Sequence, residues 1–181
     1  MDVRQAQADV RRVYRGGFAG PLVSTIVWSI ANVVFLWVSP TAGMSTLFVG
    51  GMFIFPLSTL VLKLMGGAVA LPKGHPSIAL AMQSAFTVPL GLLIAIALGA
   101  YEPLLFFPAS LIIVGAHYLV FISLYGMRLY AVLAGVLVAI GAATLFWLPN
   151  LGAVSGWIGA AVFAVFTVLL VCDRTVTTVD R

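Results

Sequence analysis

The residues able to do chemistry in this apolar chain are few, and one of them is a histidine. His117 lies well inside a long apolar stretch. The two histidines and the one cysteine, at positions 75, 117 and 172, have no metal-ligand spacing. The acidic residues all lie near the ends of apolar stretches or beyond them: Asp2, Asp9, Glu102, Asp173 and Asp180. The sequence therefore predicts no metal site and no cofactor, and its lack of an acid–base pair argues against an enzyme without deciding the matter.

Other polar side chains reach the depth of His117 from neighbouring apolar stretches. Counting from Leu104, His117 lies about 20 Å below the external boundary of the membrane, and therefore in its cytoplasmic half. Unpaired polar groups are costly in lipid, so we expect these side chains to face inward and bond with one another. We predict a polar layer forming a cytoplasm-facing cavity, centred on His117 and Gln83, with these further members: Ser84, Ser58, Thr59 and Thr87. The alternative is a histidine that only ties two helices together through a satisfied hydrogen bond.

The elements that must position these groups are membrane-spanning helices. Of the 181 residues, 62% are apolar and 8% are charged, against about 25% charged in a soluble domain. A helix needs about 20 apolar residues to cross a bilayer. Six stretches meet this requirement: 20–38, 45–65, 78–99, 104–125, 129–148 and 154–171. The fold class is therefore all-α, a polytopic membrane protein with a bundle of six transmembrane helices.

The basic residues predict the orientation of the bundle. If the first helix enters from the cytoplasm, all nine basic residues fall on the cytoplasmic side: Arg4, Arg11, Arg12, Arg15, Lys63, Lys73, Arg128, Arg174 and Arg181. The positive-inside rule then places both termini in the cytoplasm. The net charge of +4 marks topology in this interpretation and does not indicate nucleic-acid binding. We expect a multi-pass protein of the bacterial inner (cytoplasmic) membrane, with the lipid bilayer as its partner.

The chain divides into three segments. Residues 1–19 place Val3, Ala6 and Val10 on one helical face with arginines elsewhere, which favours a short amphipathic helix on the cytoplasmic surface. A solvated tail is the alternative. Residues 20–171 form the six-helix domain, and residues 172–181 form a cytoplasmic tail. Candidate contacts to lipid headgroups at the inner surface are Lys73, His75 and Arg128.

Small residues repeat at intervals of four in the last two apolar stretches. Such faces let helix backbones approach closely, which is how helices associate in lipid. We expect them to pack on each other, on a second copy of the chain in a homodimer, or on a partner membrane protein. The two faces consist of Gly156, Ala160 and Ala164, and of Ala131, Gly135 and Ala139.

The region around His117 is the least generic part of the chain. It reads Gly115-Ala116-His117-Tyr118, and it continues into a Leu124-Tyr125-Gly126 turn with a further tyrosine at 130. With Pro56-Leu57 and His75-Pro76, it resembles an uncharacterised bacterial family of small multi-span membrane proteins that carries a Gly-Ala-His motif. The resemblance covers mainly residues 52–131. It implies a membrane location and a shared histidine position, and no known activity.

Three classes of function fit these observations. A small permease or channel-like protein would use a cavity that reaches His117. A non-catalytic partner or assembly subunit would instead have a solid core and an exposed Gly/Ala groove. A lipid-directed membrane enzyme is the third and weakest class, because it needs a nucleophile or an acid–base pair that the sequence does not offer.

Overall fold

Six helices that are long and apolar enough to cross a membrane dominate the computed structural model, which describes residues 2–66 and 70–179, with side chains as far as Asp173. Across these described ranges there are seven α-helices and no strand. They are α1 Val3–Val13, α2 Ala19–Trp37, α3 Pro40–Leu64, α4 Ser77–Tyr101, α5 Phe106–Tyr125, α6 Leu129–Phe146 and α7 Gly152–Val179. Short 3-10 turns at Arg15–Gly17, Pro103–Leu105 and Pro149–Leu151 precede α2, α5 and α7. The predicted all-helical fold is confirmed over these described ranges, and so is the number of helices that could cross a membrane.

The ends of the helices follow from local capping residues. Helix α3 begins at Pro40, earlier than predicted, because the Ser39 side chain accepts a hydrogen bond from the Ala42 amide at 3.1 Å. Helix α5 ends at Tyr125 because Gly126 adopts the left-handed conformation, with φ of 65°. At the other end of the chain, α7 continues beyond Val171 to Val179. The side chain of Arg174 and all of Arg181 lie outside the described residues.

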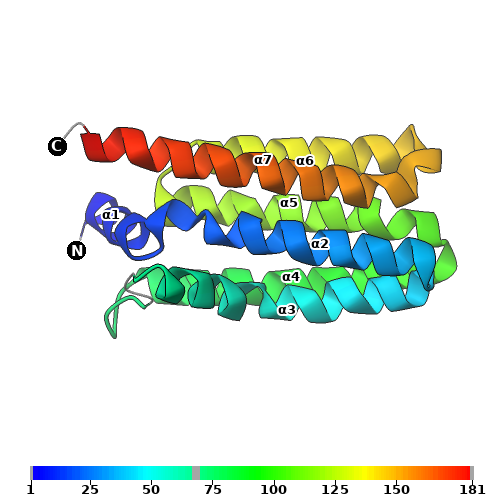
Figure 1. Ribbon diagram of the computed structural model, residues 1–181, viewed down its shortest axis with the longest axis horizontal. Coiled ribbons are helices and arrows are strands. Elements are labelled where there is room, and N and C mark those ends of the chain that lie inside the picture. Colours follow the sequence, from blue (N-terminus) through cyan, green and yellow to red (C-terminus); the bar gives the residue numbers. More distant parts are fainter. Residues whose placement is uncertain (1, 67–69, 180–181) are drawn as a thin grey trace.

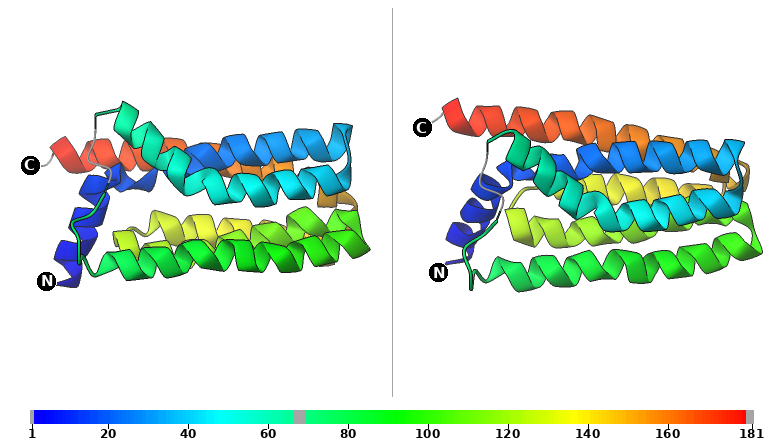
Figure 2. Two further views of the ribbon diagram at one scale, coloured as in Figure 1. Left: turned by 90° about the horizontal axis from the view of Figure 1, so that it is seen from below. Right: turned by 60° about the horizontal axis from the view of Figure 1, so that its bottom comes forward.

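The six long helices form two layers of three (Figure 2). One layer has the order α7, α2, α3, and the other has the order α6, α5, α4. The central helix of each layer packs against the helix that follows it in the chain: α2 against α3, and α5 against α6. On its other side, α2 packs against α7 and α5 packs against α4. Since consecutive helices run in opposite directions, α2 and α5 are antiparallel (Figure 1). The two halves, α2–α4 and α5–α7, therefore have the connectivity of an inverted-topology repeat.

Aromatic rings from three helices fill the centre of the bundle. Trp28 of α2 lies with its ring centroid 6.0 Å from that of Phe107 in α5 and 5.6 Å from that of Phe163 in α7. All three side chains are buried. A Cβ at Gly159 of α7 would lie 3.1 Å from the Trp28 ring, so this glycine lets α7 approach the indole closely. The core therefore joins α2 to α7 and α5.

Helix α1 lies across one end of the bundle, the end that also carries the last turns of α7 (Figures 1 and 2). We call it the terminal end. The buried residues of α1 are Ala6 and Val10, and this helix packs mainly against α5. The chain then turns into α2 through Gly16 and Gly17, which both have positive φ angles of 72° and 80°. This turn lets α1 run across the end of the bundle.

Candidate functional site

A cavity of about 300 Å³ lies between α2, α3, α4 and α5 and extends to α1 at the terminal end. Its wall contains Trp28 of α2, Leu92 of α4 and His117 of α5. Its volume is at the lower limit of ordinary small-molecule pockets, which range over about 300–1,000 Å³. His117 thus lies in the wall of a cavity, whereas Gln83, the other predicted centre of the polar layer, does not line it.

The shape of α3 explains why space remains beside His117. Helix α3 contains Pro56, which cannot donate a backbone hydrogen bond and bends the helix. Figure 2 shows the second half of α3 turning away from α4 toward the terminal end. The two helices pack less extensively than α2 with α3 or α4 with α5. The residues of α3 and α4 that face each other across this gap line the cavity.

The cavity opens sideways between α3 and α4. Met52 and Phe55 of α3 and Met82 of α4 line it, although their side chains are 51%, 59% and 51% exposed. In a bilayer these exposed apolar side chains contact lipid tails. The border of the cavity between α3 and α4 is therefore formed by apolar side chains on the outer surface of the bundle.

Polar groups contribute little to the cavity wall. Among the residues that the structure describes, no aspartate, glutamate, lysine or arginine lines it. Its polar side chains are Ser24, Ser58, Thr59, His117 and the tyrosines Tyr14, Tyr118 and Tyr125. A charged molecule would find no counter-ion there, and burial of an unpaired charge is very costly. The site fits a neutral ligand.

His117 is held by a serine of the neighbouring helix. Its Nδ1 lies 2.9 Å from the Ser84 hydroxyl oxygen, so α5 and α4 are joined at this level. Most hydroxyls in these helices donate to a carbonyl one turn earlier, as Ser110 does to Phe106 at 2.8 Å. The direction of the bond between Ser84 and His117 depends on which ring nitrogen carries the proton.

The rest of the predicted polar layer is divided between the cavity and the outer surface. Ser58 is buried and its hydroxyl contacts the carbonyl of Ala19 at 3.1 Å, which joins α3 to α2. Thr59 lines the cavity. Gln83 and Thr87 are exposed and do not line it. Ser84 does not line the cavity either, but it is buried against His117, and Gln83, one residue earlier and about 100° around the helix, faces outward.

An aromatic wall beside His117 was not anticipated from the sequence. Tyr118, Phe121 and Tyr125 line the cavity, and the Phe121 ring centroid lies 4.9 Å from that of His117. Phe121 and Tyr125 are stacked, with centroids 5.6 Å apart. The sequence does contain a pattern that predicts this wall. Phe121 and Tyr125 follow Tyr118 by three and seven positions, and residues at these spacings lie on the same face of a helix.

Helix α1 forms the floor of the cavity at the terminal end. Val10 and Tyr14 line it there, and burial, the larger effect, raises the pKa of the Tyr14 phenol, while a hydrogen bond to the Leu71 backbone lowers it. The Arg11 guanidinium donates to the carbonyl of Tyr125 at the end of α5. Helix C-termini carry unpaired carbonyls and partial negative charge, so this arginine stabilises the docked helix.

Two further contacts hold the turn between α1 and α2. The Arg15 guanidinium donates to the Met65 carbonyl at 2.9 Å, at the end of α3. The Tyr130 hydroxyl of α6 donates to the Gly16 carbonyl at 2.8 Å. The amino-terminal segment therefore contacts the ends of α3, α5 and α6 at the terminal end of the bundle and acts as a clip that joins them.

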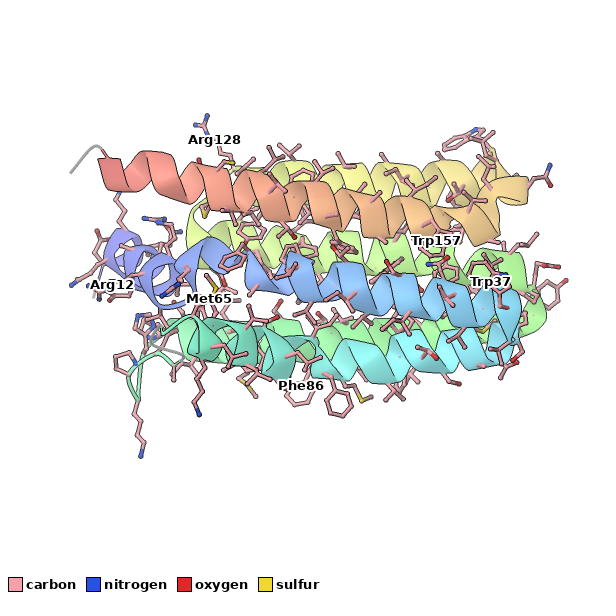
Figure 3. All side chains as sticks on the ribbon, in the orientation of Figure 1. Arg12, Trp37, Met65, Phe86, Arg128 and Trp157 are labelled. Carbon is pink, nitrogen blue, oxygen red and sulfur yellow. The ribbon has the colours of Figure 1, made fainter. Side chains whose placement is uncertain are left out.

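The three candidate headgroup contacts have different environments. Lys73 and Arg128 are exposed, and neither side chain has an ion pair or hydrogen bond among the described residues. Figure 3 shows the Arg128 side chain pointing away from the bundle. His75 is buried instead. Its Nδ1 accepts a hydrogen bond from the Ser77 amide at 3.2 Å, and its Nε2 lies 3.8 Å from an Asp9 carboxylate oxygen. It joins α1 to the start of α4.

The two small-residue faces also differ. On α7, Gly156 and Ala160 are buried, and a Cβ at Gly156 would lie 2.3 Å from the Asn32 amide of α2. This face packs within the chain. The face on α6 is exposed at all three of its residues, Ala131, Gly135 and Ala139. No described atom outside the helix's own backbone would lie within 4 Å of a Cβ added at Gly135. Across the described part of the chain, no group of histidine, cysteine or acidic residues could hold a metal ion.

Comparison with known proteins gives one match. A model described as a family of unknown function (DUF7010) matches residues 3–173. The match covers most of the chain, so the protein belongs to this family. No curated protein and no solved structure matches it.

Proposed function

We propose that this member of a family of unknown function is a small permease-like carrier that admits neutral, membrane-soluble molecules to the cavity beside His117. The observation that carries the proposal is the apolar cavity with its sideways opening between α3 and α4. A carrier of this kind takes its substrate from the lipid phase. The residues we assign to the site are His117, Ser84, Ser58 and Thr59.

The arrangement of the helices supports a carrier. Secondary transporters are commonly built from inverted repeats, with the substrate site between the two halves. Here the cavity lies between α2 and α3 of one half and α5 of the other, and α4 closes the remaining side. Proline-containing helices border it, as Pro56 lies in α3 and Pro89 of α4 lines the wall.

An aqueous channel fits these residues less well. Pores that conduct ions are lined by carbonyl oxygens or charged side chains, and apolar constrictions exclude water. Among the described residues, the lining that α3 and α4 contribute is apolar except for Ser58 and Thr59. We therefore favour binding from the bilayer over conduction of water or ions.

We also propose the orientation and location that the charges favour. The described basic residues belong to α1, the end of α3, the loop before α4 and the turn before α6, which all meet at the terminal end. With the positive-inside rule, this supports both termini in the cytoplasm of a bacterial cell, with α1 lying at the inner membrane surface. The same proposal divides the chain into a cytoplasmic segment, residues 1–19, a membrane domain, residues 20–171, and a cytoplasmic tail, residues 172–181.

A cavity-filling substitution tests the proposed function. Ala81 of α4 lines the cavity, whereas Ala97 of the same helix is exposed and does not. Native mass spectrometry of the purified protein with added decylbenzene should show one bound molecule for the wild type and for Ala97→Phe. The Ala81→Phe variant should bind none, because its phenyl ring occupies the cavity. Equal binding by all three proteins would contradict the proposal.

A further inference from the structure

Helix α1 covers the cavity at the terminal end of the bundle (Figure 2). Val10 of α1 and Tyr14, the residue that follows the helix, line the cavity there together with Leu71 of the loop before α4. Val10 is 1% exposed, whereas Arg4 and Arg12 of the same helix are exposed. The apolar face of α1 therefore closes the cavity, and its charged face forms part of the outer surface.

The polar contacts that dock α1 on α5 can be replaced by water. Gln7 donates through Nε2 to the Ser123 carbonyl at 2.9 Å, and the Arg11 guanidinium donates to the Tyr125 carbonyl. Carbonyls in the last turn of a helix have no partner within the helix, so they accept from side chains or from water. The first of these contacts is exposed and the second is only partly buried. Lifting α1 from α5 therefore exchanges these bonds for bonds to water.

The turn between α1 and α2 has the backbone of a hinge. Three consecutive residues have positive φ angles: Arg15 at 48°, Gly16 at 72° and Gly17 at 80°. A positive φ is strained for an arginine, and such strain persists only where surrounding contacts hold it. The bond of Arg15 to the Met65 carbonyl is one such contact, while the Tyr130 hydroxyl fixes the Gly16 carbonyl to α6. Because glycine adopts many backbone conformations, α1 can rotate about this turn while α2 stays in place.

We propose that α1 is a lid over a second opening of the cavity, at the terminal end, and that this lid opens by rotation about residues 15–17. The inference rests on the proposed function, because a carrier that takes a neutral molecule from the bilayer must also release it elsewhere. With α1 docked, Val10 and Tyr14 separate the cavity from water. With α1 lifted, the molecule leaves at the membrane surface. Arg11 and Arg15 hold the lid closed.

Access of water to a residue beneath the lid tests the inference without a ligand. Leu62, near the end of α3, is 2% exposed and lines the cavity. In a protein that carries Cys172→Ser, the thiol introduced by Leu62→Cys should react slowly with the charged reagent trimethylammonium-ethyl methanethiosulfonate. Adding Arg11→Gln should raise this rate about 10-fold, because it weakens the docking of α1. Adding Arg4→Gln, the matched control at an exposed position, should leave the rate unchanged.

A buried position elsewhere separates opening of the lid from unfolding. Leu137 of α6 is fully buried and does not line the cavity, so the thiol introduced by Leu137→Cys should stay unreactive in each of these backgrounds. Equal rates for Leu62→Cys with and without Arg11→Gln would overturn the lid. A parallel increase at Leu137→Cys would overturn it as well, because Arg11 would then stabilise the whole bundle and not the position of α1.

Release of a ligand connects the lid with the carrier. The bromine of a ring-brominated decylbenzene quenches indole fluorescence, so its release into excess decylbenzene is followed by recovery of the Trp28 emission, with Trp28→Phe as the control for the other indoles. Arg11→Gln should speed release about 10-fold and leave the affinity unchanged, since a lid that opens more often raises entry and exit together. Equal release rates in the wild type and Arg11→Gln would overturn the lid and leave the carrier intact. Failure of the probe to bind would overturn the carrier, and the thiol reaction rates would still decide whether α1 opens.

Discussion

Gly141 is the position at which a single methyl group should disturb the bundle most directly. It is buried on the face of α6 that packs against α5, and a Cβ added there would lie 2.7 Å from the Pro108 carbonyl oxygen and 3.0 Å from the Ile112 amide nitrogen. Both are backbone atoms of α5, so the methyl group can be accommodated only by moving a helix. Overpacking of this kind costs about 1–3 kcal/mol.

The expected effect of Gly141→Ala is therefore a lower melting temperature. Alanine also gains about 1 kcal/mol of helix propensity there, which leaves a net cost of up to about 2 kcal/mol. For a chain of this size about 1 kcal/mol corresponds to roughly 2–4 °C, so Tm should fall by up to roughly 8 °C. Gly135→Ala is the matched control, because it lies in the same helix, faces outward and has open space around it. Alanine is the better helix former by about 1 kcal/mol, so this variant should be as stable as the wild type or more so.

Thermal unfolding of the purified protein in detergent, followed by circular dichroism, measures both variants under the same conditions. If Gly141→Ala melts at or above the temperature of Gly135→Ala, the close approach of α5 and α6 described here is wrong. A similar loss in both variants would also count against it, since it would show that Gly135 is packed against something.

Two further substitutions test how the amino-terminal segment is held. Gly17→Ala should destabilise the protein, because Gly17 has φ of 80° and an added Cβ would lie 2.2 Å from the Tyr130 hydroxyl; an unchanged Tm would show that the turn is arranged differently. Arg11→Gln should increase hydrogen exchange in the amides of α1, because it removes the bond to the Tyr125 carbonyl, which is worth about 1.5–3 kcal/mol as a charge-assisted contact. Arg4→Gln, at an exposed position, is its control and should leave exchange unchanged; equal protection in both variants would argue against the clip.

The spans were predictable from the sequence because each is recorded locally, in about 20 consecutive apolar residues. The predicted and observed helices differ at their ends, where a single capping residue determines the position at which a helix begins or ends. Ser39 extends α3 toward its start, which the apolar pattern alone does not reveal. Ser84, which contacts His117, was a member of the predicted polar layer because it lies at the same depth in the preceding helix, although that layer was centred on His117 and Gln83.

The interior of the site was less predictable because it depends on helix rotation. Depth places Gln83 level with His117, but the rotation of α4 turns Ser84 inward and leaves Gln83 exposed. The same limit applies to the small-residue faces, because nothing in the spacing tells which face packs within the chain. Gly156 meets Asn32 inside the bundle, whereas Gly135 faces outward.

The arginines of the first segment show a third limit. Their alternation with apolar residues suggests a helix on the membrane surface, and that role stays a prediction. What the pattern could not reveal is that Arg11 and Arg15 reach the carbonyls at the ends of α5 and α3. These contacts join residues 114 and 50 positions apart in the chain, and a local pattern contains no information about them.

The central claim is that the interior of the bundle is reached from the lipid phase between α3 and α4, and labelling with a small lipophilic carbene in vesicles tests it most directly. Leu92 is 2% exposed and lines the cavity, whereas Leu137 of α6 is fully buried and does not. Peptide mapping by mass spectrometry should therefore find label at Leu92 and none at Leu137. Absence of label at Leu92, with normal labelling of the exposed Phe86 of the same helix, would contradict the account.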